Sequence, residues 1–248
     1  MIRYSEEDVL NVLYTLELPA AAKRFHELFR SPELANYSQV QFFREVMEPQ
    51  YIETCNNRFE TNIRLSSLIN RGALAENLKT GNGRIYDDST VRQIFSFSFV
   101  EDRLNVGIYG VTGAGKSYFL SALCIEACRR NYRSKFIDYC DLLDELIVLS
   151  RQDDLSKYRK RIRYYARIQL LFIDDFAISR YTEEGIKILY HLIKTRDDLG
   201  TSTVFTSQYA PDEWGSKLSD DEGCYGKFDG IRRRLTSGFT VLIEKSGS

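Results

Sequence analysis

The stretch GIYGVTGAGKSYFL, from Gly107 to Leu120, contains the spacing Gly-x-x-x-x-Gly-Lys-Ser. Small residues at positions 113 to 115 allow the backbone to curl so that successive N–H groups point at one bound oxyanion. A helix that begins near Lys116 would direct the positive end of its dipole at the same place. The flanking sequence supplies the strand before and the helix after that this motif requires. We therefore predict a phosphate-binding loop rather than an ordinary glycine-rich turn.

Side chains at the end of this loop have the chemistry to hold a nucleoside triphosphate and its cation. Lys116 is expected to reach the β- and γ-phosphates as a point charge, and the Ser117 hydroxyl to bind Mg²⁺. The nucleotide-binding residues predicted from the motif are Gly110, Val111, Thr112, Gly113, Ala114, Gly115, Lys116, Ser117 and Tyr118.

A pair of carboxylates follows an apolar run further along the chain, in RIQLLFIDDFA. Asp174 and Asp175 would stand at the carboxyl end of a buried strand, where open parallel sheets bind their ligands. Asp174 is predicted to hold Mg²⁺, and Asp175 to orient or deprotonate the water that attacks the γ-phosphate. An acidic turn without a catalytic role is the alternative. Aspartate is one methylene shorter than the glutamate of fast ATPases, so we expect slow turnover.

Short apolar runs alternate with helical patterns from Asn105 onward, in the order NVGIYG, SKFIDY, LLFIDD, TSTVFTSQ and FTVLIE. This alternation predicts a parallel α/β sheet. Residues 6 to about 75 show helical spacing instead, with a connector at RSPELANYS and a capping serine at Ser38. The polar stretch Lys79–Ser89 is predicted to be a hinge, with the boundary near 80 to 95. We therefore predict an all-helical N-terminal domain for partner or oligomer contacts over residues 1–85, and an α/β nucleotide domain over 86–248.

The chain has 248 residues, of which 43% are hydrophobic and 28% charged, enough for one α/β domain and a smaller helical one. No apolar segment approaches the roughly 20 residues that span a bilayer, and the N-terminus lacks the apolar run of a signal peptide. The sequence therefore predicts a cytoplasmic protein without a membrane partner. Five scattered cysteines without a C-x-x-C pair indicate reduced thiols, and Cys124 and Cys128 are expected in the core.

Basic residues are concentrated in two places, although the formal net charge is only −1. The segment KYRKRIRYYAR, residues 157–167, holds six of them and no acidic residue, and RRR follows at 232–234. A basic helix can bind DNA phosphates without reading the sequence, or it can be an ordinary solvated surface helix. The residues predicted to bind DNA are Lys157, Arg159, Lys160, Arg161 and Arg163.

The order of these motifs, followed by FTSQYAPDEW and GIRRRLTSGFTVLIE, resembles the AAA+ ATPases of the initiator clade, and within them the IstB/DnaC group. LYTLELPAAAKRFHEL and FFREVMEPQYIETCNNRFETNIRLSSL resemble the N-terminal helices of IstB-type transposition helpers, so the likeness covers most of the chain. The resemblance implies an AAA+ core without a C-terminal lid, and ATP bound between neighbouring subunits of an oligomer. It places the family's paired arginines on Arg232 and Arg234, with Arg234 the first choice for the arginine that completes a neighbour's site. Three solvated arginines on a surface helix are the alternative.

Two departures from the family pattern concern the catalytic site. Gln208, or the hydroxyls of Thr206 and Ser207, would sense the γ-phosphate from the polar end of the run TSTVFTSQ, and a polar strand end without that role is the alternative. The family's Thr-Ser-Asn reads Thr-Ser-Gln here, so the family pattern does not support a sensor role for Gln208. The family's terminal Ser-Tyr-Arg is replaced by Glu-Lys-Ser-Gly-Ser, so a second sensor arginine is not expected.

The resemblance implies an ATP-dependent, DNA-binding oligomer that helps a cognate transposase to select and engage double-stranded target DNA. ATP would drive assembly, and hydrolysis would release or remodel it. The alternative is a replicative helicase loader of the DnaC type, which the ATPase core does not distinguish, although LELPAAAKRF favours the transposition helper. A small-molecule kinase with a phosphate-binding loop is a third interpretation, and the sequence offers no evident lid over an acceptor.

Overall fold

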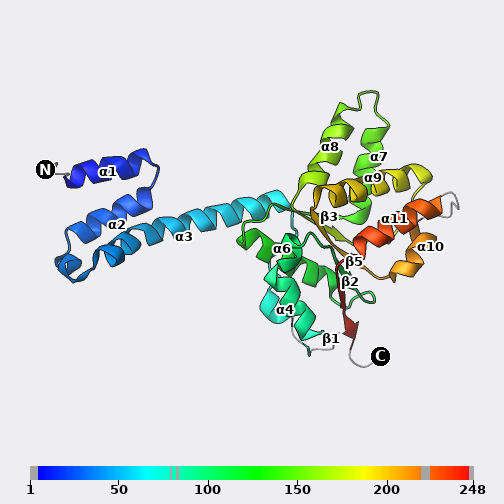
Figure 1. Cartoon of the computed structure of the whole chain (residues 1–248), viewed down its shortest axis with the longest axis horizontal. Coiled ribbons are helices and arrows are strands. Elements are labelled where there is room, and N and C mark those ends of the chain that lie inside the picture. Colours follow the sequence, from blue (N-terminus) through cyan, green and yellow to red (C-terminus); the bar gives the residue numbers. More distant parts are fainter. Residues whose placement is uncertain (1–4, 79, 82–83, 219–223, 246–248) are drawn as a thin grey trace. The chain divides into compact units, whose positions relative to one another are not determined.

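The computed structural model describes residues 5–78, 80–81, 84–218 and 224–245, and Figure 1 labels its helices and strands. The chain divides into two compact units, Met1–Thr61 and Asn62–Ser248. The first unit is helical, and the second contains the sheets.

The first unit is a group of helices around a small apolar core. Its elements are α1 (Glu6–Thr15), α2 (Pro19–Phe29), the 3₁₀ helix η1 (Pro32–Asn36) and most of α3 (Gln39–Ser66). Phe25 and Leu28 of α2 meet Val46 of α3 in this core. The predicted cap before α3 is confirmed, because the Ser38 hydroxyl accepts from the Gln41 N–H at 3.3 Å and the Gln41 side chain accepts from the Ser38 N–H at 3.0 Å.

A five-stranded parallel sheet forms the centre of the second unit, in the order β3-β4-β5-β2-β6. The strands are β2 (Val106–Tyr109), β3 (Ser134–Asp138), β4 (Leu170–Asp174), β5 (Ser202–Ser207) and β6 (Phe239–Leu242). Each strand lies within one of the five apolar runs, so the predicted parallel α/β sheet is confirmed. A separate antiparallel ribbon of β1 (Arg84–Ile85) and β7 (Glu244–Lys245) is not predicted, because two residues show no alternation.

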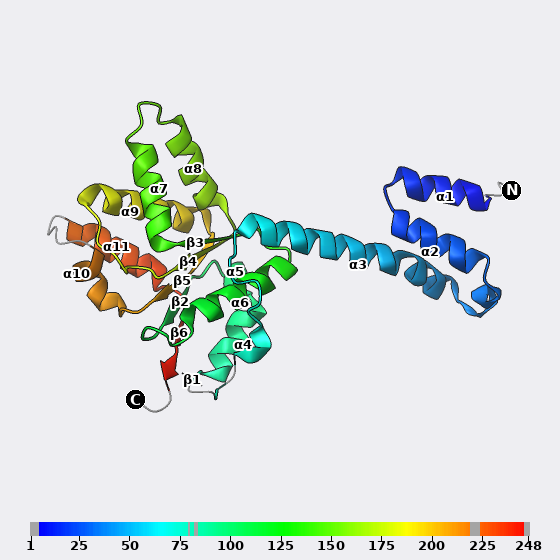
Figure 2. The ribbon, with the colours of Figure 1, turned by 180° about the vertical axis from the view of Figure 1, so that it is seen from behind.

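Helices cover both faces of the parallel sheet. They are α4 (Asp88–Ser96), α5 (Ser98–Glu101), α6 (Lys116–Arg129), α7 (Tyr139–Ser150), α8 (Ser156–Arg167), α9 (Glu183–Leu199), α10 (Trp214–Leu218) and α11 (Tyr225–Leu235), with 3₁₀ turns η2 (Ala75–Asn77) and η3 (Pro211–Glu213). Figures 1 and 2 show α4 and α6 on one face, and α9, α10 and α11 on the other. Ile173 and Phe205 point from β4 and β5 into the core beneath α9 and α11.

Residues 62–85 belong to the second compact unit, whereas the sequence groups them with the N-terminal helices. The Leu74 N–H and the Asn77 amide both donate to the Tyr118 hydroxyl of α6 at 3.0 Å, which fastens η2 to the nucleotide domain. The predicted hinge falls partly on residues 79, 82 and 83, outside the described residues. In the sequence, the first compact unit ends at residue 61 and the second begins at residue 62. The functional domain boundary between residues 85 and 86 stays a prediction.

The structure also tests two expectations from the sequence, which concern membrane-spanning helices and the burial of two cysteines. Within the described residues, no helix combines the length and the apolar character needed to cross a membrane. Cys124 and Cys128 of α6 are buried free thiols, as their expected place in the core requires.

Arg196 of α9 is enclosed by the second unit, with only 1% of its surface exposed. Its guanidinium donates to the Tyr165 and Ile168 carbonyls at the end of α8, at 2.5 and 3.0 Å. It also donates to the Ser202 carbonyl and the Thr203 hydroxyl of β5, at 2.5 and 2.9 Å. Burial lowers the pKa of Arg196 to about 9, so the group remains charged at neutral pH. This side chain therefore joins α8 to β5.

Arg196→Ala is expected to destabilise the second unit by about 3–5 kcal/mol, because buried carbonyl oxygens lose their donor and a cavity remains. Chemical unfolding followed by circular dichroism measures this loss. Lys194→Ala, at an exposed position of the same helix, is the matched control and should change the free energy of unfolding by less than about 0.5 kcal/mol. A loss below about 1 kcal/mol for Arg196→Ala would contradict the role given to this side chain.

Candidate nucleotide-binding site

The predicted phosphate loop joins β2 to α6, and other chain segments approach it closely at both ends. Gly110 and Gly115 have φ angles of 155° and 100°, which side-chain-bearing residues rarely adopt. A Cβ atom at Gly110 would lie 2.6 Å from the Ile243 carbonyl oxygen. One at Gly115 would lie 3.0 Å from the Arg84 guanidinium. Both positions of the motif therefore require glycine in this fold.

Lys116 and Ser117 begin α6 directly after the loop. The buried Lys116 ammonium group donates to the Val111 carbonyl oxygen at 3.2 Å, so it lies over the loop. The Ser117 hydroxyl donates to Asp174 Oδ1 at the end of β4, at 3.1 Å. The structure thus brings together the predicted phosphate-binding residues and a predicted acidic residue, 57 positions apart in the chain.

The neighbouring strand β5 holds both acidic residues in place. Thr206 Oγ1 donates to Asp174 Oδ1 at 2.5 Å and accepts from the Asp175 N–H at 2.8 Å. Asp175 has a φ of 52°, so the chain turns sharply where β4 ends. Ser207, another of the alternative sensors, donates instead to the Phe176 carbonyl at 3.0 Å. Of the two hydroxyls, Thr206 is therefore the one that contacts the paired aspartates.

The Asp175 carboxyl group lies among other charges. Partial burial raises its pKa above the usual value, and the negative charges of Asp174 and Asp138 raise it further, while the Lys116 ammonium opposes them. Asp138 ends β3 in register with Asp174. The motifs do not include Asp138, although aspartate follows the apolar residues of SKFIDY just as it follows those of LLFIDD. Three carboxylates therefore stand at the ends of two adjacent strands.

The oxygen atoms of Ser117 and Asp174 fit a hard divalent cation. Mg²⁺ prefers hydroxyl, carboxylate, phosphate and water oxygens in an octahedral arrangement. The hydroxyl and one carboxylate oxygen are 3.1 Å apart, so both can face one position beside the loop. The two predicted ligands, Ser117 and Asp174, therefore offer the kind of oxygen atoms that Mg²⁺ binds.

Gln208 lies beside the phosphate loop, since its side-chain oxygen accepts from the Thr112 hydroxyl at 2.8 Å. An open cavity of about 780 Å³ begins there and extends along Gly110 and Val111 to the end of β6. Tyr118 is engaged elsewhere, because its hydroxyl accepts from η2. The structure therefore places Gln208 at the loop and gives the Tyr118 hydroxyl a partner outside it.

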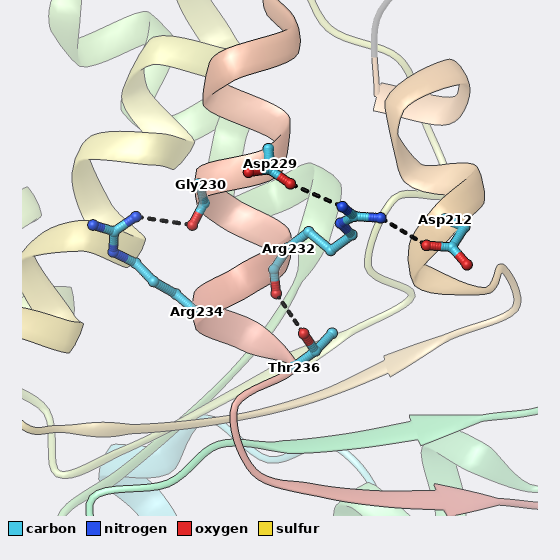
Figure 3. A network of polar contacts seen from close by, with 6 residues as sticks. All are labelled: Asp212, Asp229, Gly230, Arg232, Arg234 and Thr236. Carbon is cyan, nitrogen blue, oxygen red and sulfur yellow. Dashed lines mark hydrogen bonds and ion pairs between the residues drawn. The ribbon is translucent and has the colours of Figure 1, made fainter.

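Arg232 of α11 is held by two carboxylates, as Figure 3 shows. Its Nη1 lies 2.7 Å from Asp212 Oδ1, and its Nη2 lies 2.8 Å from Asp229 Oδ1. The Arg232 side chain is 43% exposed, and both carboxylates are more exposed still. Exposed pairs of this kind contribute about 0–1 kcal/mol each, so another molecule can compete for this guanidinium.

Arg234, two residues further along α11, points toward α9 (Figure 3). Its Nη1 donates to the Gly230 carbonyl at 2.9 Å, and its Nε lies 3.1 Å from Asp197 Oδ2. Its guanidinium also lies over the Tyr190 ring, 5.6 Å from the centroid. Only 12% of the side chain is exposed. Arg234 therefore fastens α11 to α9 in the isolated chain.

The basic helix α8 forms a hairpin with α7 that extends beyond the sheet (Figure 2). Lys157, Arg159, Lys160 and Arg163 are exposed, whereas Ile162 and Tyr165 are buried against the core. Arg161 differs from the other basic residues because its Nε lies 2.9 Å from Glu145 Oε1 of α7. The structure therefore places the predicted DNA-binding residues on one solvated helix, apart from the phosphate loop.

The sequence profile described as "IstB-like ATP binding protein" matches residues 11–229. This range contains the phosphate loop, the paired aspartates and Gln208, and it ends before Arg232 and Arg234. An insertion-sequence ATP-binding protein of Geobacillus stearothermophilus is 25% identical over 87% of this chain and 84% of its own length. One of Pseudomonas fluorescens is 24% identical over 82% of this chain and 86% of its own length.

Solved structures show the same fold at lower identity. DnaA from Aquifex aeolicus, bound to AMPPCP, matches with a TM-score of 0.55 and 22% identity over 72% of this chain and 52% of its own. The chain thus spans about half of that structure. The DnaC helicase loader matches with a TM-score of 0.53 and 17% identity, over 70% of this chain and 98% of its own. The family profile matches residues 11–229, which is most of this chain. The chain therefore belongs to the IstB-like ATP binding proteins.

Proposed function

We propose that this chain binds and slowly hydrolyses ATP, and that it acts as an oligomer on DNA to help a cognate transposase engage its target. The observation that carries the ATPase part is the hydrogen bond between Ser117 and Asp174 beside Lys116. It joins a loop with phosphate-binding chemistry to the Asp174 carboxylate at the end of β4, the second strand from β2 in the sheet. Family membership supports the nucleotide and the setting in an insertion sequence.

Each side chain of the site then has a separate task. Backbone N–H groups of the loop and the Lys116 ammonium bind the β- and γ-phosphates. Ser117 and Asp174 would hold Mg²⁺, which supplies charge neutralisation on the phosphate oxygens when bound. Asp175 orients the attacking water and accepts its proton, and Thr206 keeps both aspartates in position. Gln208 is placed to sense the γ-phosphate, because it is bonded to Thr112 of the loop.

The role in transposition rests on the relatives, whose names place them in insertion sequences. The fold is also that of the DnaC helicase loader, so a loader remains the second candidate. Binding of this chain to the transposase and to the replicative helicase of the same cell, measured side by side, separates the two. Strong binding to the helicase alone would contradict the transposition role.

An arginine of α11 would complete the ATP site of a neighbouring subunit, as the resemblance implies. The contacts make Arg232 the better candidate in this chain, because its guanidinium is more exposed than that of Arg234. The resemblance favours Arg234, but to act in trans this side chain would have to leave Asp197 and Tyr190. Both assignments stay predictions.

Lys116→Ala is expected to abolish ATP binding, whereas Asp175→Asn should keep binding and lower hydrolysis by at least about 100-fold. Nucleotide affinity and steady-state hydrolysis, measured on the same preparations, distinguish the two effects. An ordinary aspartate becomes protonated near pH 3.9, as an approximate value. Because the pKa of Asp175 is raised, this residue should become protonated, and wild-type hydrolysis should decline, at a higher pH than that. Normal hydrolysis by Asp175→Asn would show that another group handles the water.

DNA affinity is expected to fall steeply with salt, because each phosphate neutralised by α8 contributes roughly 0.9 to the log–log slope. Replacing Arg159, Lys160 and Arg163 by glutamine should flatten this slope by about 2 to 3 and weaken binding to all duplexes alike. Arg161→Gln, which removes a guanidinium already paired with Glu145, should change it by less than about 1. An unchanged slope in the triple variant would show that DNA binds to a surface other than α8.

Mixing two inactive variants tests the shared site. Arg232→Ala should bind ATP but hydrolyse it on the order of 10³-fold more slowly, and adding Lys116→Ala protein should restore activity at mixed interfaces. The parallel experiment mixes Arg234→Ala with Lys116→Ala. The Arg234→Ala protein should have a lower thermal midpoint than the wild type, because it loses the contact between α11 and α9. Sedimentation verifies that mixed oligomers form. If they form and neither mixture recovers activity, these arginines do not act in trans.

A further inference from the structure

Arg84 lies against the phosphate loop although no motif includes it. It belongs to β1, whose pairing with β7 places it opposite residue 245. A Cβ atom on Gly115 would lie 3.0 Å from both Cζ and Nε of Arg84, so the guanidinium covers the glycine that caps α6. A second side-chain cation is thus positioned at the loop that carries Lys116.

The charge of Arg84 acts on the start of α6. Hydrogen bonds from Leu74 and Asn77 lower the pKa of the Tyr118 hydroxyl, and the charge of Arg84 lowers it further. Among the aspartates and glutamates that the structure describes, none forms an ion pair with Arg84. A cation without an acidic partner at the positive end of a helix is electrostatically unfavourable unless an anion binds nearby.

The strand order indicates which end of a bound nucleotide Arg84 would meet. The loop follows β2, which has β5 and then β4 on one side and β6 on the other. Asp174 ends β4 and marks the side of the γ-phosphate. Ile243 follows β6 and leads into β7, the partner of β1, and its N–H donates to the Tyr109 carbonyl of β2 at 2.8 Å. A nucleotide extended across the loop therefore has its α-phosphate on the side of Arg84.

We propose that Arg84 is a further nucleotide-binding residue, whose guanidinium binds the α-phosphate of ATP and of ADP. This assignment rests on the proposed function and extends it to a residue outside the motif. A guanidinium suits the task because it presents several N–H donors in one plane to phosphate oxygens. The β1–β7 ribbon, and not the loop itself, supplies this cation.

Calorimetric titration of the full chain with ADP and with AMPPCP, each in Mg²⁺, tests this assignment. Arg84→Gln removes the charge, so the affinity for both nucleotides should fall by the same factor, about 10- to 100-fold. Arg84→Lys keeps the charge and should lose less. Arg92→Gln, at an exposed position of α4, is the matched control and should bind both nucleotides as the wild type does.

Several outcomes would overturn the assignment. A loss confined to AMPPCP would place Arg84 at the γ-phosphate, and unchanged affinity would remove it from the site. Equal losses in Arg84→Gln and Arg84→Lys, or a large drop in the thermal midpoint of nucleotide-free Arg84→Gln, would assign the residue to packing. Failure of the proposed function itself looks different, because the wild-type protein would then bind ADP no better than Lys116→Ala.

Discussion

The register of three parallel strands is the constraint on which the site depends. Asp174 Oδ1 accepts hydrogen bonds from Ser117, after β2, and from Thr206 on β5, so one carboxylate connects three strand ends. These bonds form only while Ile173 pairs with Phe205 and Tyr109 with Ser207. A shift of one residue would turn Asp174 to the other face of the sheet, away from both hydroxyls. The apolar side chains that fix the register therefore also fix the chemistry.

Much of the fold follows from patterns that are local in the sequence. Each strand of the parallel sheet lies in a short apolar run, and the buried residues of α9 recur at helical spacing. The phosphate loop and the aspartates after β4 are likewise contiguous motifs, so their places at one edge of the sheet could be expected. Ser38 could be identified as a cap because its partner Gln41 is only three residues away.

Local patterns of this kind do not predict contacts between segments that are far apart in the sequence. Asp138 and Arg84 approach the site because strands pair, and neither residue belongs to a run with a known spacing. The three arginines of α11 look alike in the sequence, and only their surroundings separate a guanidinium enclosed by Asp197 and Tyr190 from one at the surface. Arg196 shows the same limit, since one charged residue within an amphipathic helix gives no sign that it is buried.

The Ile243 carbonyl that lies against Gly110 and the Arg84 guanidinium that lies against Gly115 come from segments far apart in the second unit. Ile243 comes after all five strands of the parallel sheet in the chain, and its carbonyl lies against Gly110. Arg84 lies near the start of the unit and reaches its own strand partner only through residues 244–245. A chain still emerging from the ribosome can form α6 and the central strands before these contacts exist. The phosphate loop thus acquires its final surroundings only after all five strands of the parallel sheet have been synthesised.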